Sequence, residues 1–549
     1  MWNVWNRLVR KLPIIGRLKE KADRLAQLEL ALNQRQVELE LYRATFTSNT
    51  QQLRLRARDS VDEAPWRHPF LGEANIKRFR AYSEGVWQFA REHERTRTKP
   101  LKIAFSVNTA QNMYNWSRLA AKHGAEAALY LYPWDTYTLT RPEWEEFDGD
   151  YADVSDAEGF LKANPDLKPV LPCHRIPIEG NELMVARQAF LEGMRKPLLD
   201  LLATSPGVRH EALWAYEGFA AYYRWAKALA NYDVVYAAAM PFPAYASGRP
   251  YCAFSVGGDL IYDAGRGDHY GQAVSMAFGG ARFLMLSNPH PLGHCRRLGL
   301  TNAVYLPYPI DDGRYSPGEG QSRMEWHARY GPGVFVLTTA RLDRKFKGYG
   351  EEFLKSLVTV AKRRPQVRYV FLQWGEDATA FRDQVRQYGM EEHFIILSPV
   401  GKKRLIDYYR SCDIVLDHFV FGYYGATALE AAAIGKPVVM KLRTEHYAPL
   451  YAGDTMPAFN ASSPQEIGEA LTRLTDSEEL RARSGSEMRQ WLIRHHGEAR
   501  TVPLMLALLR ITAERVFLPK DLVNPLLDAD SEAEQAYHTA CLRAIDAPK

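Results

Sequence analysis

The stretch GYYGATALEAAAIGKPVV, residues 422–439, predicts a glycine turn, a short helix and a buried strand in immediate succession. Gly425 opens the predicted helix, Glu430 lies about one turn inside it and Gly435 ends it. The N–H groups at the start of a helix have no partner within the helix and form an anion site. A glycine there lets a ligand approach the backbone closely, and an acid further along can bind hydroxyl groups. The stretch therefore predicts a site for phosphate and hydroxyl groups together, as in a nucleotide sugar.

Residues 312–495 alternate buried strands with helices, which predicts a Rossmann-like domain with a parallel sheet. Arg341 and Lys347 follow its first strand within one short loop, so both side chains are expected at the same edge of the sheet. Two cations in that position fit a diphosphate. The alternative is a solvated pair of charges. The predicted strands are residues 333–339, 368–373, 394–397 and 414–416, followed by the strand that begins at Val438.

Residues 65–310 predict a first Rossmann-like domain, with strands at 102–107, 127–132, 234–238, 252–256 and 283–287. The turn at 108–115 contains no glycine, which argues against the dinucleotide loop of an NAD-dependent oxidoreductase. The strand at 252–256 leads into Gly257, Gly258 and Asp259. Because ligands bind beyond the carboxyl ends of such strands, Asp259 is the candidate acid on the acceptor side. The alternative is an aspartate that bonds its own turn.

The composition places limits on the function. The chain has 549 residues, 46% of them hydrophobic and 25% charged, which is ordinary for a globular protein of more than one domain. A net charge of +5 is too small for a dedicated nucleic-acid binder of this size. Five scattered cysteines without a CxxC pair favour a reducing cytoplasm and argue against a zinc site. No apolar run approaches the roughly 18 residues of a membrane span, and no signal peptide is evident.

Two weaker candidates lie in the first half of the chain. Asp148, Gly149 and Asp150 form a DxD triplet of the kind that can hold a divalent metal, but an acidic loop without a following strand also produces this triplet by chance. We therefore expect no metal site. His269 and His290 are candidates near the expected cleft, the alternative being ordinary loop histidines.

The N-terminal residues predict an appendage to the two domains. Residues 1–17 mix Trp2, Trp5 and aliphatic side chains with Lys and Arg, which suits an anionic membrane surface. Residues 18–57 carry a heptad series of leucines, which predicts a coiled coil and a homo-oligomer. The alternatives are a helix packed on its own protein in the first case and a single helix lying on the globular body in the second.

Residues 333–500 resemble the donor-binding domain of the family-4 retaining glycosyltransferases, which have the GT-B fold of two Rossmann-like domains facing a cleft. The markers stand in the family's order. They are ARLDRKFKG (340–348), WGED (374–377), SPV (398–400), CDIVLD (412–417) and the stretch at 422–439. MRQWLIRHHG (488–497) resembles the closing segment of such domains, and LSNP with VYLPYPID (286–289, 304–311) resembles the exit from their first domain.

The resemblance implies a role for each matching residue. Arg341 and Lys347 would neutralise the donor diphosphate and stabilise the leaving group, and Glu430 would bind the nucleotide ribose. The backbone of Gly425, Ala426 and Thr427 would face the sugar and phosphate, Val400 would lie against the base, and Gly422 and Tyr423 would form the front edge of the donor site.

The chain departs from the family pattern at two positions. Gly422 stands where many members carry a glutamate that holds the donor sugar, and Val256 stands where relatives often carry a histidine. These departures leave the donor sugar open and permit an alternative, a catalytically silent GT-B scaffold or binding protein on a coiled coil. A nucleotide-sugar epimerase on the same fold is a third possibility.

The sequence thus predicts a retaining, metal-independent glycosyltransferase that uses a nucleoside-diphosphate sugar and needs no other cofactor. Its acceptor would be a glycan or lipid-linked saccharide in surface polysaccharide synthesis, at the inner face of the cell membrane. Residues 496–549 would form a helix returning to the first domain, plus a tail.

Overall fold

The computed structural model describes residues 68–527, except 98, 133–137, 240, 266–268 and most of 177–221. Near the N-terminus it describes only residues 21, 22, 24 and 25, which are helical. The predicted membrane segment 1–17, nearly all of the predicted coiled coil 18–57 and the tail at 528–549 therefore lie outside the described residues. In the described parts of the chain, no helix is both long and apolar enough to cross a bilayer.

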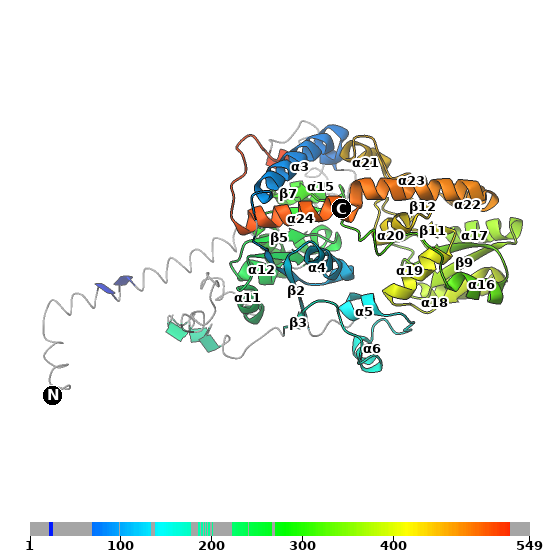
Figure 1. The fold of residues 1–549 in the computed structure, drawn as a ribbon, viewed down its shortest axis with the longest axis horizontal. Helices are drawn as coiled ribbons and strands as arrows, with labels where there is room; N and C mark the ends of the chain where they lie inside the picture. Colours follow the sequence, from blue (N-terminus) through cyan, green and yellow to red (C-terminus); the bar gives the residue numbers. More distant parts are fainter. Residues whose placement is uncertain are drawn as a thin grey trace, which may run out of the picture.

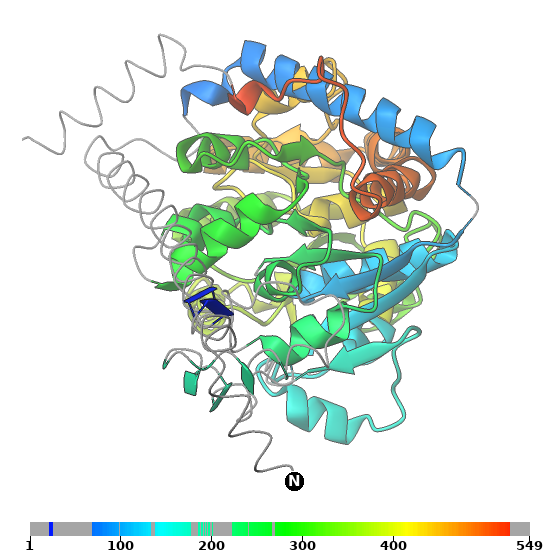
Figure 2. The same ribbon diagram turned by 90° about the vertical axis from the view of Figure 1, so that its left-hand side faces the viewer.

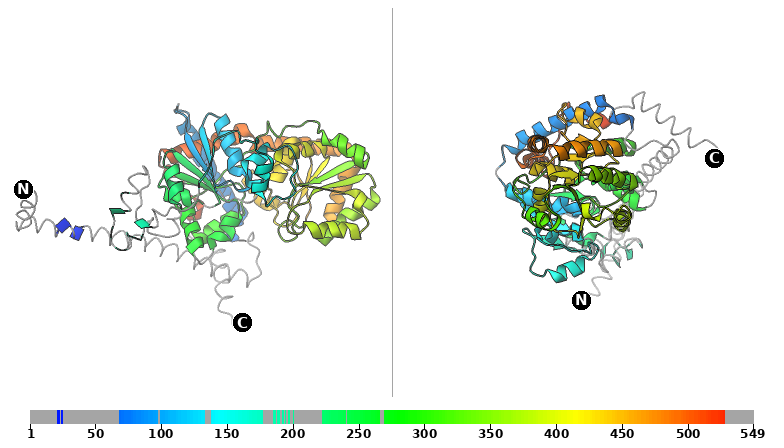
Figure 3. Two further views of the ribbon diagram at one scale, coloured as in Figure 1. Left: turned by 90° about the horizontal axis from the view of Figure 1, so that it is seen from below. Right: turned by 90° about the vertical axis from the view of Figure 1, so that its right-hand side faces the viewer.

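Two parallel sheets form two lobes, and Figure 3 shows them side by side. The first has the strand order β3-β2-β1-β4-β5-β6-β7 and the second the order β10-β9-β8-β11-β12-β13. In each sheet the first strand along the chain, β1 or β8, lies inside the sheet. The next two strands are added on one side of it and the later strands on the other, as in Rossmann-like domains. The two Rossmann-like sheets that the sequence predicts are therefore confirmed.

The strands of the first sheet are β1 (Lys102–Ser106), β2 (Glu126–Leu131), β3 (Cys173–Arg175), β4 (Val234–Ala238), β5 (Tyr251–Phe254), β6 (Leu284–Leu286) and β7 (Ala303–Tyr305). Those of the second are β8 (Val334–Thr338), β9 (Val367–Leu372), β10 (Phe394–Leu397), β11 (Ile414–Leu416), β12 (Val438–Met440) and β13 (Phe459–Asn460). Strands β4 and β8 are buried along their whole length, as expected of parallel strands with helices on both faces.

The helices of the first lobe are η2 (Pro69–Leu71), α3 (Glu73–Glu94), η3 (Thr109–Gln111), α4 (Asn112–Lys122), η4 (Thr138–Thr140), α5 (Pro142–Glu146), α6 (Ala157–Ala163), α11 (Tyr223–Leu229), α12 (Phe242–Ala246), α13 (Gly258–Ile261), η5 (Asp263–Gly265), α14 (His269–Gly280) and α15 (Pro291–Leu298). The second lobe has α16 (Ser322–Tyr330), α17 (Glu351–Arg363), α18 (Ala378–Gln387), η6 (Glu391–His393), α19 (Lys402–Ser411), α20 (Ala426–Ile434), α21 (Thr444–Leu450), α22 (Pro464–Asp476) and α23 (Glu478–His496). The last elements are α24 (Glu498–Ala513) and η7 (Pro525–Leu527).

Local sequence explains the best-defined helices. Helix α17 buries its apolar residues on one face, with two glutamates in its first turn and Lys and Arg in its last, which suits the helix dipole. Helix α22 begins with a capping box between Ser463 and Glu466 and with Pro464 in the first turn.

The described chain passes from the first lobe into the second near Ile310 and returns after His496, and these two crossings lie against each other. The N–H of Ile310 donates to the carbonyl of His496 over 3.1 Å, where the first lobe ends and α23 stops. Helix α24 then leaves α23 and packs on α3, β4 and β5 of the first lobe. Figure 1 shows α23 along the second lobe and α24 following it onto the first, and Figure 2 shows the end of the described chain beside α3. One hydrophobic core cluster accordingly contains residues of both lobes.

Helix α20 is held by a close approach of α23 behind it. Gly485 of α23 lies against Gly435, the left-handed residue that ends α20 with φ +84°. A Cβ on Gly485 would lie 2.0 Å from the carbonyl oxygen of Gly435, a backbone atom with little freedom to move. The sequence 422–439 therefore depends on a glycine about fifty residues away for its position.

We predict that Gly485→Ala destabilises the protein by about 1–3 kcal/mol, because the added methyl overpacks this contact. The matched control is Gly468→Ala in α22, also a helix interior, where the nearest atom would be 3.9 Å from the new Cβ. That change should stabilise by up to about 1 kcal/mol, since alanine is the better helix former. Urea unfolding of both variants measures the contrast. Equal stability of the two would contradict the close approach.

Candidate active site

The two lobes enclose a cleft with two adjoining cavities of about 310 and 340 Å³. Four residues line both cavities: Val256, Gly257 and His290 from the first lobe and Lys347 from the second. The first cavity also reaches Gly425 and Ala426 at the start of α20, and the second reaches Arg341 and Tyr423. These residues come from the loops that follow β5, β6, β8 and β11 and from the start of α20, at the edge of the sheets where open parallel sheets bind ligands.

Asp259 turns away from the cleft and into its own loop. Its carboxylate accepts hydrogen bonds from the Ser255 hydroxyl at 2.8 Å and from the N–H groups of Leu260 at 2.8 Å and Val256 at 3.2 Å. Burial raises the pKa of Asp259 to about 7, although these hydrogen bonds act in the opposite direction. The geometry therefore favours the turn-forming alternative, in which Asp259 fixes the loop that carries Gly257, whose φ is +105°. A direct role towards the acceptor stays a prediction.

His290 stands in the middle of the cleft, just after β6. Its ring lies 4.4 Å from the ring of Tyr423 in the other lobe, centroid to centroid. Burial lowers its pKa to about 3, helped by His446 and His418, so the imidazole is neutral at pH 7. Its Nδ1 is buried without a hydrogen-bond partner among the described residues. A neutral imidazole in this position can donate to or accept from a hydroxyl group. The sequence identifies His290 only as a weak candidate. The available signal is its position a few residues after a strand, β6.

Arg341 and Lys347 lie together, as the sequence predicts. Both line the second cavity, in the loop that follows β8. Burial lowers the pKa of Lys347, and the nearby Arg341 lowers it further while Asp417 opposes the shift. Arg341 is partly exposed, and its Nε lies 3.4 Å from the Asp343 carboxylate. No carboxylate among the described residues lies within ion-pair distance of the Lys347 ammonium.

The start of α20 faces the same cavity as Lys347. Gly425 is the N-cap of the helix, and no side chain caps it. Gly425 and Ala426 line the cavity, so free N–H groups and the Lys347 ammonium meet at one place. Thr427 lies behind them, with its hydroxyl 3.2 Å from that of Thr339. The arrangement can hold an anion of the size of a phosphate.

Gly422 has a structural reason to be glycine. Its φ is +79°, and a Cβ there would lie 2.7 Å from Cγ of Arg443. A glutamate at this position would be strained and would collide with Arg443. Tyr423 follows it and lies in the cleft wall, where its hydroxyl is 2.6 Å from Nδ1 of His446.

Glu430 is buried and already has partners. Its carboxylate accepts from the Tyr315 hydroxyl at 3.0 Å and from the Lys402 ammonium at 2.8 Å. The carboxylate of Glu145, from α5 of the first lobe, is fully buried nearby, with Arg314 at 3.3 Å. Burial acts against the charge of Lys402, but Glu430 and Glu145 outweigh it and raise its pKa. Burial also raises the pKa of Glu145 to about 7.

Residues 141–151, which we call the strap, cross from the first lobe onto the second. Figure 1 shows α5 beneath α19. Val400 is buried there and forms an antiparallel bridge with Asp150. Three backbone hydrogen bonds hold the strap: Gly401 N–H to Gly149 O (2.8 Å), Lys403 N–H to Phe147 O (3.2 Å) and Tyr151 N–H to Pro399 O (3.0 Å). The strap therefore covers Val400 and Glu430, and no sequence signal pointed to this contact.

The DxD triplet belongs to this strap. The Asp148 carboxylate pairs with Nε of Arg404 at 3.0 Å, and Asp150 uses its backbone to bridge Val400. Among the described residues, no group of three or more His, Cys, Asp or Glu side chains is arranged to hold a metal ion.

Three comparisons with known proteins are informative. The family model for Glycosyl transferases group 1 matches residues 324–491. Mannosylfructose-phosphate synthase of Agrobacterium fabrum is 27% identical over 146 residues, covering 25% of this chain and 32% of that protein. D-inositol 3-phosphate glycosyltransferase of Corynebacterium glutamicum is 26% identical over 181 residues, covering 32% and 43%. The crystal structure of HepE from Anabaena in complex with UDP and glucose is 14% identical, covers 74% of this chain and 98% of that one, and has a TM-score of 0.48.

The chain spans less than half the length of the two curated relatives described here. The matched region contains α20, the loop of Arg341 and Lys347, and all six strands of the second sheet. Residues 324–491 therefore match a Glycosyl transferases group 1 domain, and the chain has two Rossmann-like sheets facing a cleft, as in the GT-B fold.

Proposed function

We propose that the chain is a retaining glycosyltransferase that moves a sugar from a nucleoside-diphosphate sugar to a hydroxyl group of a glycan or lipid-linked saccharide. The observation that carries this proposal is the meeting of Lys347, Arg341 and the uncapped start of α20 in the cleft. A nucleoside diphosphate gains negative charge as it leaves the sugar. Fixed cations and helix N–H groups stabilise such charge in the transition state.

The first lobe supplies the other wall of the reaction space. Gly257 leaves room beside His290, since even an added Cβ would be 3.8 Å from Nε2 of that ring. We propose that the donor sugar lies between this wall and α20, with the neutral His290 bonded to one of its hydroxyls. The acceptor would enter along the first lobe and attack the face from which the diphosphate departs, which is the front-face route to a retained configuration.

Nucleotide binding at Glu430 and Val400 would need the strap to move. The strap is held largely by hydrogen bonds and ion pairs to the second lobe, with Glu145 buried at its centre. We propose that the described arrangement is a closed state, and that the base and ribose replace the strap. Polar contacts of this kind exchange readily for contacts with a polar ligand, because both states satisfy the same groups.

A catalytically silent scaffold is the second candidate. The glycine at 422 and the strap over Glu430 favour it, whereas the unpaired Lys347 at the helix start favours the enzyme. Thermal shift with UDP, GDP and ADP separates the two, followed by a screen of nucleotide sugars for donor hydrolysis. Stabilisation by one nucleotide together with hydrolysis of its sugar supports the transferase. Absence of any shift would favour the scaffold.

We predict that Lys347→Ala and Arg341→Ala each lower kcat by about a hundredfold or more, the usual loss when one charge-stabilising donor is removed. Arg344→Ala is the matched control, because this exposed arginine is on the same loop, pairs with Asp377 and lines neither cavity. It should change kcat little. Steady-state kinetics with the donor found in the screen provide the measurement, and near-wild-type turnover in either test variant would refute the assignment.

Glu145 should make the strap sensitive to pH. Its pKa of about 7 in the folded chain lies above the ordinary 4.5, so the folded state binds this proton more tightly. The stability from Glu145 is therefore complete below about pH 4.5 and is lost as the pH rises through 7. Glu145→Gln stays neutral and escapes this loss. The melting temperature of Glu145→Gln minus that of the wild type should therefore increase from pH 5 to pH 8.

The control for this comparison is Glu158→Gln on α6, an exposed acid that pairs with Lys162. Its difference from the wild type should not depend on pH in this range. Other titratable groups, such as Asp259, are present in all three proteins, so their effects cancel in the differences in melting temperature. A Glu145→Gln gap that is constant from pH 5 to pH 8 would rule out a buried, proton-binding Glu145.

Residues 1–17, which lie outside the described residues, are proposed to bind the inner face of the membrane, with residues 18–57 joining copies of the chain. Liposome flotation with anionic vesicles tests the first point. The full chain should float and a chain lacking residues 1–17 should remain at the bottom, because the tryptophans and basic residues are lost together. Equal flotation of both would show that another surface binds the lipid.

A further inference from the structure

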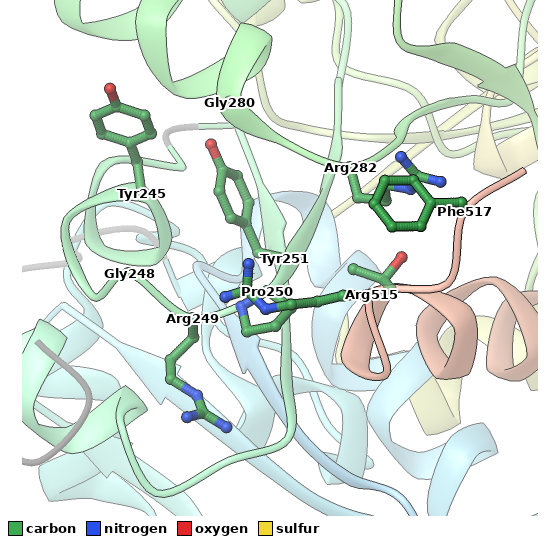
Figure 4. A pocket seen from close by; sticks show the side chains of 10 residues that line it. Tyr245, Gly248, Arg249, Pro250, Tyr251, Gly280, Arg282, Arg515 and Phe517 are labelled. Carbon is green, nitrogen blue, oxygen red and sulfur yellow. The ribbon is translucent and has the colours of Figure 1, made fainter. Parts of the chain in front are cut away.

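A third cavity, of about 460 Å³, lies in the first lobe at the end of the sheet opposite the cleft (Figure 4). Pro250 and Tyr251, where β5 begins, line it, whereas Ser255 and Gly257, just past the end of β5, line the cleft. The strand between them has four residues and so separates the two sites by about 13 Å. The other lining residues are Tyr245, Gly248, Arg249, Gly280, Arg282, Thr512, Arg515 and Phe517.

The cavity is cationic. Its lining includes three arginines and no acidic residue. Figure 4 shows Arg515 reaching across the cavity towards Pro250 and Tyr251, with Arg282 beside Phe517 and Arg249 turned outward. The Arg515 guanidinium has no hydrogen bond or ion pair with any described residue. Arg282 donates from Nη2 to the carbonyl of Val516 at 2.9 Å, and its Nε is buried without a partner in the described parts of the chain.

Arg515 occupies a backbone position where glycine is normal. Helix α24 ends with the hydrogen bonds Val516 N–H to Ile511 O and Arg515 N–H to Thr512 O, which place residue 515 in the left-handed region with φ +54°. The same pair of bonds ends α15 at Gly299 and α20 at Gly435. A non-glycine residue there costs about 1–2 kcal/mol. Residues held in such sparsely populated backbone conformations cluster at functional sites.

The cavity walls are aromatic. Gly280 lets two tyrosines come close, because a Cβ on it would lie 2.6 Å from the Tyr245 ring and 2.7 Å from the Tyr251 hydroxyl. Phe517 stands at the rim with 87% of its surface exposed. Guanidinium groups between aromatic walls suit an anion that carries an organic body, since the planar fork matches phosphate oxygens in pairs and the rings contact the rest of the ligand.

We propose that this cavity binds the phosphate group of a phosphorylated ligand, with Arg515 and Arg282 as its anion-binding residues. The inference goes beyond the proposed transfer reaction, because the cavity is separate from the cleft and holds none of its residues. Two sources share this chemistry: the headgroup of an anionic phospholipid and a soluble phosphorylated molecule. Both place one phosphate against the same two guanidinium groups.

The first arm of the test titrates inorganic phosphate into the full chain by calorimetry. Arg515→Gly removes the cation and leaves a residue that prefers the left-handed conformation, so its melting temperature should equal or exceed that of the wild type. The expected result is a Kd raised about tenfold or more, the loss of one charge-assisted contact. Arg483→Ala, an exposed arginine on α23, is the control and should leave the Kd unchanged. Phosphate that binds in the cleft does so equally in the wild type and in both variants, so it does not contribute to the difference between them.

The second arm measures co-sedimentation of the same proteins with vesicles of phosphatidylcholine containing phosphatidylglycerol. A drop for Arg515→Gly in this arm alone supports the proposal and identifies lipid as the source, and a weaker phosphate Kd supports a soluble ligand. If Arg515→Gly fails to fold, Arg282→Gln replaces it in both arms. The proposal is overturned if the folded variant equals the wild type in phosphate affinity and in vesicle binding.

Discussion

The cleft depends on the hydrogen bonding between the two crossings of the chain. Ile310 leaves the first lobe and His496 leaves the second, and they are joined by an N–H to carbonyl bond of 3.1 Å. The imidazole Nδ1 of His496 lies 3.0 Å from the carbonyl of Tyr308, and burial keeps its pKa near 3, so the ring is neutral. These bonds fix the two crossings side by side. They bring the ends of β5 and β6 opposite the loop after β8 and the start of α20.

This arrangement determines the electrostatics of the cleft. The second lobe presents Lys347 and free helix N–H groups to the cavity, while the first lobe presents glycine, valine and a neutral histidine. Burial makes the charge of Lys347 costly and lowers its pKa, and a bound anion would reduce that cost. At the far end of the cleft, next to the strap, Glu145 pairs with Arg314 and Glu430 pairs with Lys402, so the charges balance. The half of the cleft with Arg341 and Lys347 is open, whereas the strap covers the half in which the charges are balanced.

Sequence patterns recovered most of the framework. Strands β4, β10 and β11 have the predicted bounds, and most others differ by one or two residues, because buried parallel strands read as short apolar runs between turns. The sequence also predicted that Arg341 and Lys347 lie together, because a short loop after a strand keeps both side chains at the same edge of the sheet. Asp259 was harder: the sequence placed it at the correct loop, but only the tertiary structure shows that its carboxylate bonds to that loop. Strand β3 and the long helix α3 were not predicted, as neither carries a motif.

By itself, the sequence determined the two Rossmann-like sheets, the helix start at Gly425 and the loop of cations, because each depends on neighbours a few residues away. Tertiary structure alone decided the rest. Glu145 meets Lys402, Gly485 meets Gly435 and Arg515 faces Pro250 across separations of 50 to more than 250 residues. Burial, and with it the pKa of Lys347, His290 and Glu145, exists only once those distant segments have packed. Local chemistry in a sequence indicates which groups are available, and packing decides which of them remain open to a ligand.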